Sequence, residues 1–247
     1  MERQRYGRRL ERKQGRHPCG GLDVSGEINM LGWLPENVST YGGQIDRLFS
    51  IIQWITGITF VIVIVLLLFF IVKYRDQGGR RATYTHGSTV LEVLWTIVPA
   101  VILIVLFMMS QSLWWSIKGS VPDTDFHVQV KAKQFNWTFT YPGPDRVFGT
   151  ADDLTMENEL HVPVNKIVRV SLQSDDVIHS FFLPNLRLKQ DTVPGRDIPA
   201  WFEATKTGRY EIPCAELCGF GHSGMLGFLT VHSSEDYQKW ASERWPS

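Results

Sequence analysis

Two long apolar stretches dominate the hydrophobic pattern of the first half of the chain. Residues 49–72 contain no charged side chain, and they exceed the roughly 20 helical residues needed to cross a bilayer core. Residues 90–115 contain a single charged residue, Glu92, and end in Trp114 and Trp115, a pair typical of a membrane boundary. The pattern therefore predicts two transmembrane helices.

The second half of the chain shows the two-residue alternation of half-buried strands. Apolar and polar side chains alternate over residues 128–141, 167–174 and 227–233, with Gly, Pro and Asp between these segments. Several short strands separated by such turn residues are typical of a β-sandwich or a small Greek-key barrel. We expect one all-β domain over residues 119–240.

The loop between the two spans predicts how the chain is oriented in the membrane. Residues 73–89 carry four basic residues against one acidic residue, and short basic loops remain in the cytoplasm. The N-terminal segment, residues 1–48, and the β domain would then both lie outside the cytoplasm. Residues 1–16 hold seven Lys and Arg, but they lie too far from the first span to dominate its orientation.

The start of the chain fits no transmembrane or secretory pattern. One interpretation is that the protein begins at Met30 and that residues 1–29 are disordered or lie before the true start. Cys19 falls in this segment, and we assign it no role.

The overall charge balance hides an asymmetry between the two halves. The chain has 25 Lys and Arg and 25 Asp and Glu, but residues 119–247 hold 12 basic and 17 acidic residues, a net charge of −5. An acidic domain is a poor general nucleic-acid binder. Three cysteines are too few for a disulfide scaffold.

One segment, residues 213–225, gathers soft metal donors at close spacing. Its candidate ligands are Cys214, Cys218, His222 and Met225. Thiolate and imidazole donors favour copper or zinc, and a nearby thioether favours copper. A disulfide between the cysteines would leave the other two donors unexplained. A mononuclear copper site needs only one thiolate, whereas two thiolates can bridge two copper ions. No CxxCH motif is present, so we expect no covalent haem.

A further ligand should come from another part of the β domain. His179 is the best candidate, because it lies at the end of a predicted strand beside Phe181 and Phe182, which would exclude water. The remaining histidines are expected to be ordinary surface or core residues: His86, His127, His161 and His232. The acidic stretch 145–153 does not fit an EF-hand and is expected to be a surface loop.

At these residues the chain resembles subunit II of haem–copper cytochrome c oxidases, over roughly residues 40–240. The resemblance rests on Cys-x-Glu-x-Cys-x3-His-x2-Met at 214–225, DVIHSFFLP at 176–184 and LEVLWTIVPAVIL at 91–103. It implies a two-helix transmembrane hairpin followed by an all-β cupredoxin-like Greek-key barrel that carries the binuclear copper centre CuA.

The resemblance implies six copper ligands: His179, Cys214, the backbone carbonyl of Glu216, Cys218, His222 and Met225. In the family, both thiolates bridge the two ions and each imidazole caps one of them, while the thioether and the carbonyl are weak ligands. The side chain of Glu216 would reach a magnesium ion shared with subunit I.

Three further features are implied less specifically. Glu92 and Trp95 match a Glu-x-x-Trp setting at the entrance of a proton pathway, although Glu92 could also be a residue facing headgroups. Three carboxylates match positions that help to dock cytochrome c, or simply form a solvated acidic surface: Asp175, Asp176 and Asp191. Residues 189–196 resemble the family segment that faces subunit I.

The chain departs from the family at one position. A Gln-Trp-x-Trp strand accepts the electron in the family, whereas this chain reads Gln134-Phe135-Asn136-Trp137. We expect Phe135 and Trp137 to share one exposed strand face, since residues i and i+2 point to the same side. The change leaves two donor classes open, a c-type cytochrome or the haem domain of a partner complex.

Together these features predict subunit II of a terminal respiratory oxidase in a bacterial inner membrane, with the copper domain on the periplasmic side. It would pass electrons from a c-type cytochrome through CuA to haem in subunit I, where oxygen is reduced and protons are translocated. Its partners would be subunit I, other oxidase subunits, the donor and membrane lipid. The alternatives are a copper-free quinol oxidase subunit II and a stand-alone membrane-anchored copper electron carrier.

Overall fold

The computed structural model describes residues 34–79, 81, 83–119 and 121–245. The predictions for Cys19, for a start at Met30 and for residues 1–29 lie outside the described residues. The first two elements are long helices, α1 (Gly42–Lys73) and α2 (Thr89–Lys118). Each contains an 18-residue stretch of high mean hydropathy, 3.2 in α1 and 2.6 in α2, so both are long and apolar enough to cross a membrane. Both helices extend beyond the apolar stretches, because flanking polar residues continue the helical backbone.

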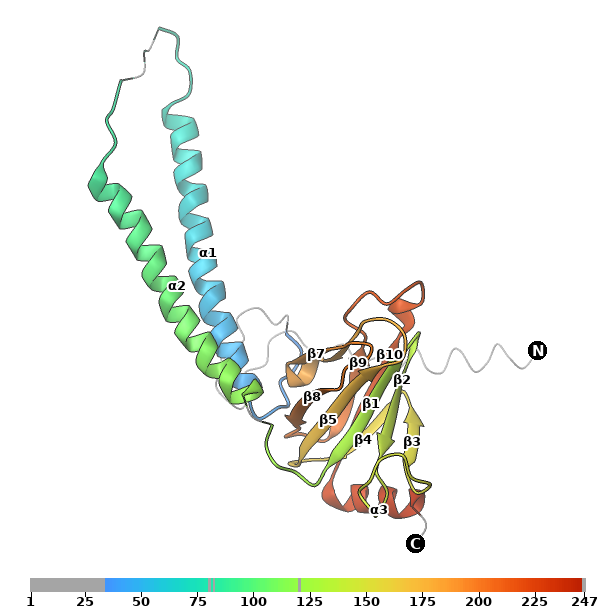
Figure 1. Ribbon diagram of the computed structural model, residues 1–247. Helices are drawn as coiled ribbons and strands as arrows, with labels where there is room; N and C mark the ends of the chain where they lie inside the picture. The colour runs from blue at the N-terminus through green and yellow to red at the C-terminus, as the bar shows by residue number, and fades with distance from the viewer. Residues whose placement is uncertain (1–33, 80, 82, 120, 246–247) are drawn as a thin grey trace, which may run out of the picture. The chain divides into compact units, whose positions relative to one another are not determined.

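Within the part of the chain that the structure describes, ten strands and a short C-terminal helix follow the two long helices (Figure 1). The strands are β1 (His127–Lys133), β2 (Asn136–Tyr141), β3 (Leu154–Glu157), β4 (Glu159–Pro163), β5 (Ile167–Ser174), β6 (His179–Leu183), β7 (Leu188–Thr192), β8 (Ile198–Glu203), β9 (Gly208–Pro213) and β10 (Leu226–His232). The final helix is α3 (Ser234–Arg244), which begins at a Ser233 side-chain cap and continues past the predicted domain end at residue 240.

The strands form three sheets. One has the order β3-β2-β1-β5-β8, one has the order β4-β10-β9, and β6 pairs with β7. Two neighbouring pairs, β1 with β5 and β4 with β10, are parallel, and the other pairs are antiparallel. Burial alternates residue by residue along β1, β2, β5 and β10, as expected where one face of a sheet covers a core.

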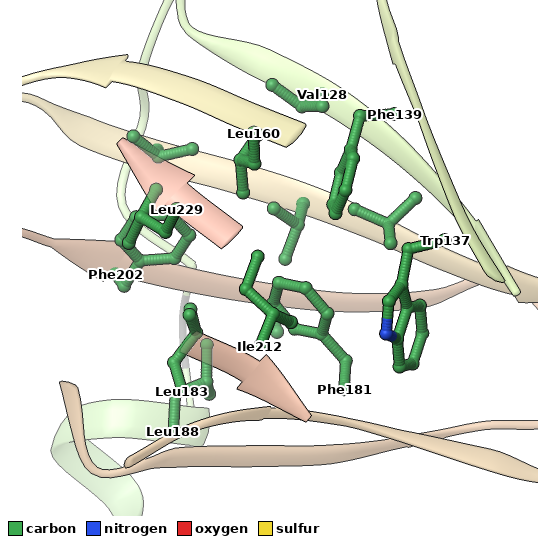
Figure 2. Close-up of a cluster of buried hydrophobic side chains, with 14 of the residues drawn as sticks. Val128, Trp137, Phe139, Leu160, Phe181, Leu183, Leu188, Phe202, Ile212 and Leu229 are labelled. Atoms are coloured by element: carbon green, nitrogen blue, oxygen red, sulfur yellow. The ribbon is translucent and has the colours of Figure 1, made fainter. Parts of the chain in front are cut away.

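A single hydrophobic core lies between the sheets. Figure 2 shows side chains from every sheet meeting there, including Val128, Trp137, Leu160, Phe181 and Ile212. This packing buries the apolar face of each strand, which supplies most of the stability of such a domain. The predicted fold class, a two-helix hairpin followed by an all-β cupredoxin-like domain, is confirmed.

The stretch predicted as one alternating segment, residues 128–141, is instead a hairpin. Lys133 and Asn136 pair with each other, so Gln134 and Phe135 form a two-residue turn between β1 and β2. Reading the segment as one alternation overlooked a shift in phase, because the buried positions are Val128, Val130 and Ala132 in β1 but Trp137, Phe139 and Tyr141 in β2. This turn proves central to the candidate site.

Candidate metal centre

The loop between β9 and β10 carries five of the six predicted ligand positions. The backbone N–H of Cys214 donates to the carbonyl of Met225 over 3.0 Å and closes the base of the loop. One turn of 3₁₀ helix, His222–Gly224, follows the second cysteine and leads to Met225. Residues that are eleven positions apart in the sequence are therefore brought to one point.

Two glycines let the β1–β2 turn lie directly on this loop. A Cβ atom at Gly219 would come within 2.6 Å of the Gln134 side chain, and one at Gly221 would come within 2.5 Å of the Phe135 ring. Gly219 also has φ +137°, a conformation that L side chains rarely adopt. Gln134 Nε2 donates to the carbonyl of Cys218 over 2.6 Å, which joins the turn to the loop.

His179 reaches the same point from β6. Its side chain is fully buried. His179 is the first residue of β6, at the N-terminal end of that strand. Strand β6 lies beside the start of the loop. Phe181 forms an isolated antiparallel β-bridge with Cys214, and the N–H of Ala215 donates to the carbonyl of Ser180 over 3.0 Å.

The six predicted donors converge on the two cysteine sulfurs. The Sγ atoms of Cys214 and Cys218 are 3.9 Å apart. His179 Nδ1 lies 3.9 Å from Cys214 Sγ, and His222 Nδ1 lies 3.6 Å from Cys218 Sγ. The remaining two donors complete the group: Met225 Sδ lies 3.8 Å from Cys218 Sγ and the carbonyl oxygen of Glu216 lies 3.3 Å from Cys214 Sγ.

This donor set fits soft metal ions. The ligand atoms of His179, Cys214 and Cys218 all lie within 4.8 Å of one another. Metal–thiolate bonds are about 2.3 Å long at zinc, so two thiolates that share an ion can be up to about 4.6 Å apart. The cysteines are free thiols, and a disulfide would need a sulfur separation near 2.05 Å. Six donors exceed the four that a tetrahedral zinc ion uses, and they suit two copper ions.

Burial controls the protonation of the site. Burial, together with the neighbouring Cys214, raises the pKa of the Cys218 thiol to about 11. Without a metal ion this thiol is protonated at neutral pH, whereas a metal ion binds the thiolate. Metal binding at Cys218 must therefore release a proton, and the apparent affinity rises with pH.

The second nitrogen of His179 faces a carboxylate. His179 Nε2 lies 2.7 Å from Asp176 Oδ1. Burial opposes ionisation of Asp176, but hydrogen bonds from His179 and from the backbone N–H groups of Gln134 and Val177 outweigh it and hold its pKa below the usual value. The carboxylate is thus ionised at neutral pH and held by three donors.

The prediction that Phe135 and Trp137 share an exposed face is wrong. Phe135 lies in the turn and is 38% exposed, whereas Trp137 lies on the inner face of β2 and is fully buried. The turn interrupts the alternation, so the i, i+2 rule does not link the two rings. Trp137 instead packs edge-on against Phe181 and His179, with ring centroids 5.6 and 6.2 Å away.

The other predicted positions lie at the edge of the metal site or away from it. The carboxylates of Glu216 and Asp191 lie 3.9 and 3.8 Å from Lys189 Nζ, and all three side chains are about half exposed. Asp191 also accepts a hydrogen bond from Ser180 Oγ. Glu92 lies in the first turn of α2 and is exposed.

Sequence reasoning missed two features that the fold reveals. The contact of Gln134 with the metal loop has no local sequence signal, since 84 residues separate Gln134 from Cys218. His161 and His232 were expected to be ordinary residues, yet their ring nitrogens lie 2.8 Å apart. They stack beneath Trp240 of α3, away from the metal ligands.

Comparisons with known proteins identify the family of the chain. The family model for the periplasmic domain of cytochrome c oxidase subunit II matches residues 134–231, and the model for its transmembrane domain matches residues 29–113. The chain is 31% identical to the alternative cytochrome c oxidase subunit 2 of Bradyrhizobium diazoefficiens, over 86% of this chain and 83% of that protein.

Two further relatives extend the comparison. Cytochrome c oxidase subunit 2 of Thermostichus vulcanus is 31% identical over 85% of this chain and 77% of its own length. A solved periplasmic domain of subunit II of cytochrome oxidase from Bradyrhizobium japonicum is 31% identical, with a TM-score of 0.46, over 51% of this chain and 96% of that one. The family matches cover both the helical hairpin and the β domain that holds the donor set. The chain therefore belongs to the subunit II family of cytochrome c oxidases, as an oxidoreductase component of a haem–copper oxidase.

Proposed function

We propose that this chain is the electron-accepting subunit of a terminal respiratory oxidase. It takes electrons one at a time from a c-type cytochrome on the periplasmic side and delivers them to haem in subunit I, where oxygen is reduced and protons are translocated. One observation carries the proposal: two thiols, two imidazole Nδ1 atoms, a thioether and a carbonyl oxygen converge within bonding reach of shared ions.

The protein residues hold this donor set in advance. When bound, a binuclear copper centre supplies reversible one-electron chemistry. Cys214 and Cys218 would bridge the two ions, His179 and His222 would each bind one of them, and Met225 would be a weak ligand. The buried β6 strand and the closed loop keep these donors in place, so little movement of the protein accompanies a change of charge.

The surface above the loop fits a redox partner. Phe220 and Leu217 of the loop are exposed, and Phe135 lies partly exposed against the loop glycines. Asp175 is half exposed, and its backbone N–H donates to the carbonyl of Ala132 just before the β1–β2 turn, so its carboxylate lies near this patch. An apolar patch with a charged rim is the usual anatomy of a docking site. Phe135 would be the first aromatic ring that the donor meets, with Trp137 packed behind it against His179.

The face formed by β7 and the start of the metal loop would lie toward subunit I. Glu216 contacts both the metal ligands and β7. Its carbonyl oxygen lies near Cys214 Sγ, and its carboxylate lies near Lys189 Nζ. A carboxylate in that position suits a magnesium ion completed by subunit I. Glu92, at the other end of α2, would admit protons into subunit I from the cytoplasmic side.

The donor set and the position of Glu92 bear on the two alternative functions, a quinol oxidase subunit and a copper carrier. A copper-free quinol oxidase subunit would not need two thiols and two imidazoles gathered at one buried point. A stand-alone copper carrier would use the same site, but it would not need a carboxylate within the second membrane helix. Co-purification of the chain with subunit I distinguishes the carrier from the oxidase subunit.

Electron acceptance is tested with the full-length chain in detergent after copper loading. Mixing with a reduced basic c-type cytochrome should oxidise the cytochrome rapidly, and the Cys218→Ser variant should show no such reaction. Cys19→Ser is the matched control, because it removes the third thiol and should leave the rate unchanged. Equal rates for wild type and Cys218→Ser would refute the proposal.

A further inference from the structure

Asp176 lies in the bend between β5 and β6, three residues before His179. Its Oδ1 atom is 2.7 Å from His179 Nε2, while His179 Nδ1 faces Cys214 Sγ on the other side of the ring. Both oxygens of the Asp176 carboxylate accept hydrogen bonds from backbone N–H groups, so this side chain acts as an acceptor. His179 Nε2 must therefore carry the proton, and Nδ1 keeps the lone pair that a metal ion needs.

The carboxylate itself cannot turn away from the ring. The N–H of Gln134 donates to its Oδ2 atom and the N–H of Val177 donates to its Oδ1 atom, each over 2.6 Å. Gln134 also holds the metal loop through the carbonyl of Cys218. The β1–β2 turn thereby fixes two ligand-bearing segments at once, one directly and the other through Asp176.

The neighbouring carboxylate has a different environment. Asp175 is 51% exposed in its side chain and lies 3.5 Å from Lys131 Nζ at the surface. Asp176 is 30% exposed, and it faces a histidine that is fully buried. These adjacent carboxylates thus differ in exposure and in partner, and of the two only Asp176 contacts a predicted metal ligand.

We propose that Asp176 is a positioning residue that holds His179 in the Nε2–H tautomer and directs its Nδ1 atom at the metal site. This inference rests on the proposed function, because it assigns Asp176 to the copper centre rather than to donor docking. A carboxylate partner makes a ligating imidazole a stronger donor, and loss of such a partner typically weakens metal affinity about 10–100-fold.

The test compares Asp176→Asn with Asp175→Asn in the full-length chain. Both variants remove one negative charge from the same surface, so any effect on donor steering should be similar. Copper affinity, measured by competition with a chelator, should fall about 10–100-fold in Asp176→Asn alone. The reduction potential should also shift upward in Asp176→Asn, because a weaker imidazole donor stabilises oxidised copper less. Equal affinities and equal potentials in the two variants would overturn the proposal.

A second measurement needs neither copper nor a folded variant. Nitrogen NMR of the metal-free wild-type chain, with labelled histidine, should show His179 protonated at Nε2. A proton on Nδ1 would overturn the inference. If the wild-type chain binds no copper, the proposed function fails, while the tautomer still decides the role of Asp176.

Discussion

At the residue scale, the two aromatic positions near the metal site have separate roles. Trp137 is fully buried between β2 and the metal site, whereas Phe135 is partly exposed on the loop. Trp137→Ala should destabilise the β domain by about 3–5 kcal/mol, because it empties a large core position. Phe135→Ala should cost roughly 1–2 kcal/mol but slow electron acceptance from the donor. Calorimetry of the metal-free chain and stopped-flow reduction measure the two effects. A larger loss of stability for Phe135→Ala would contradict this assignment.

The residues at the metal site differ in how well the sequence could predict their roles. The loop ligands could be predicted, because thiol, imidazole and thioether groups recur at short spacing on one segment. His179 was reached through its aromatic neighbours and the family motif. The Asp176–His179 hydrogen bond could have been suspected from their three-residue spacing. The roles of Gln134 and Phe135 could not, because a phase shift in the alternation can mark a turn but cannot show that the turn lies on a loop 84 residues away.

At the element scale, helix α3 is attached to the β domain through a histidine pair. Trp240 stacks on His161 with ring centroids 4.6 Å apart, and His161 Nδ1 meets His232 Nε2. Burial, together with His232, Arg244 and Arg209, lowers the pKa of His161 to about 4. Burial also lowers the pKa of His232, although Asp236 opposes the shift.

This pair should make the stability of the domain depend on pH. An unfolded histidine takes up its proton near pH 6.5, whereas folded His161 resists protonation until about pH 4. The contribution of His161 to stability is therefore complete above pH 6.5 and decreases as pH falls toward 4. The thermal midpoint should decrease over this window, and it should decrease less steeply in His161→Gln. Identical slopes in both proteins would show that the pair does not carry the effect.

At the scale of the whole molecule, the proposed function places electron input and proton input on opposite sides of the membrane. Residues 119–247 carry a net charge of −5, and salt screens such attraction beyond a Debye length of about 8 Å at physiological ionic strength. The second-order rate with a basic cytochrome should therefore fall as salt is added. Asp175→Asn should flatten this dependence, while Glu243→Gln, on α3 at the far end of the β domain from the metal loop (Figure 1), should change it little. A rate that rises with salt would exclude a basic donor.

A variant of Glu92 tests the proposed proton entrance on the cytoplasmic side of the membrane. Glu92 lies in the first turn of a helix of 30 residues, and a bilayer core of about 30 Å would separate it from the copper domain. Glu92→Gln should slow turnover of the assembled oxidase while reduction of the copper centre by the donor stays at the wild-type rate. Slower copper reduction in the variant would indicate a defect of folding or assembly instead.

The most direct test of the central claim is the copper content and electron paramagnetic resonance spectrum of the full-length chain. The paired thiols and imidazoles predict two copper ions per chain, with one unpaired electron shared equally by two copper nuclei in the oxidised form. Cys214→Ser should abolish that shared signal, because one thiolate cannot form the double bridge. One copper ion per chain with a spectrum from a single nucleus would contradict the account.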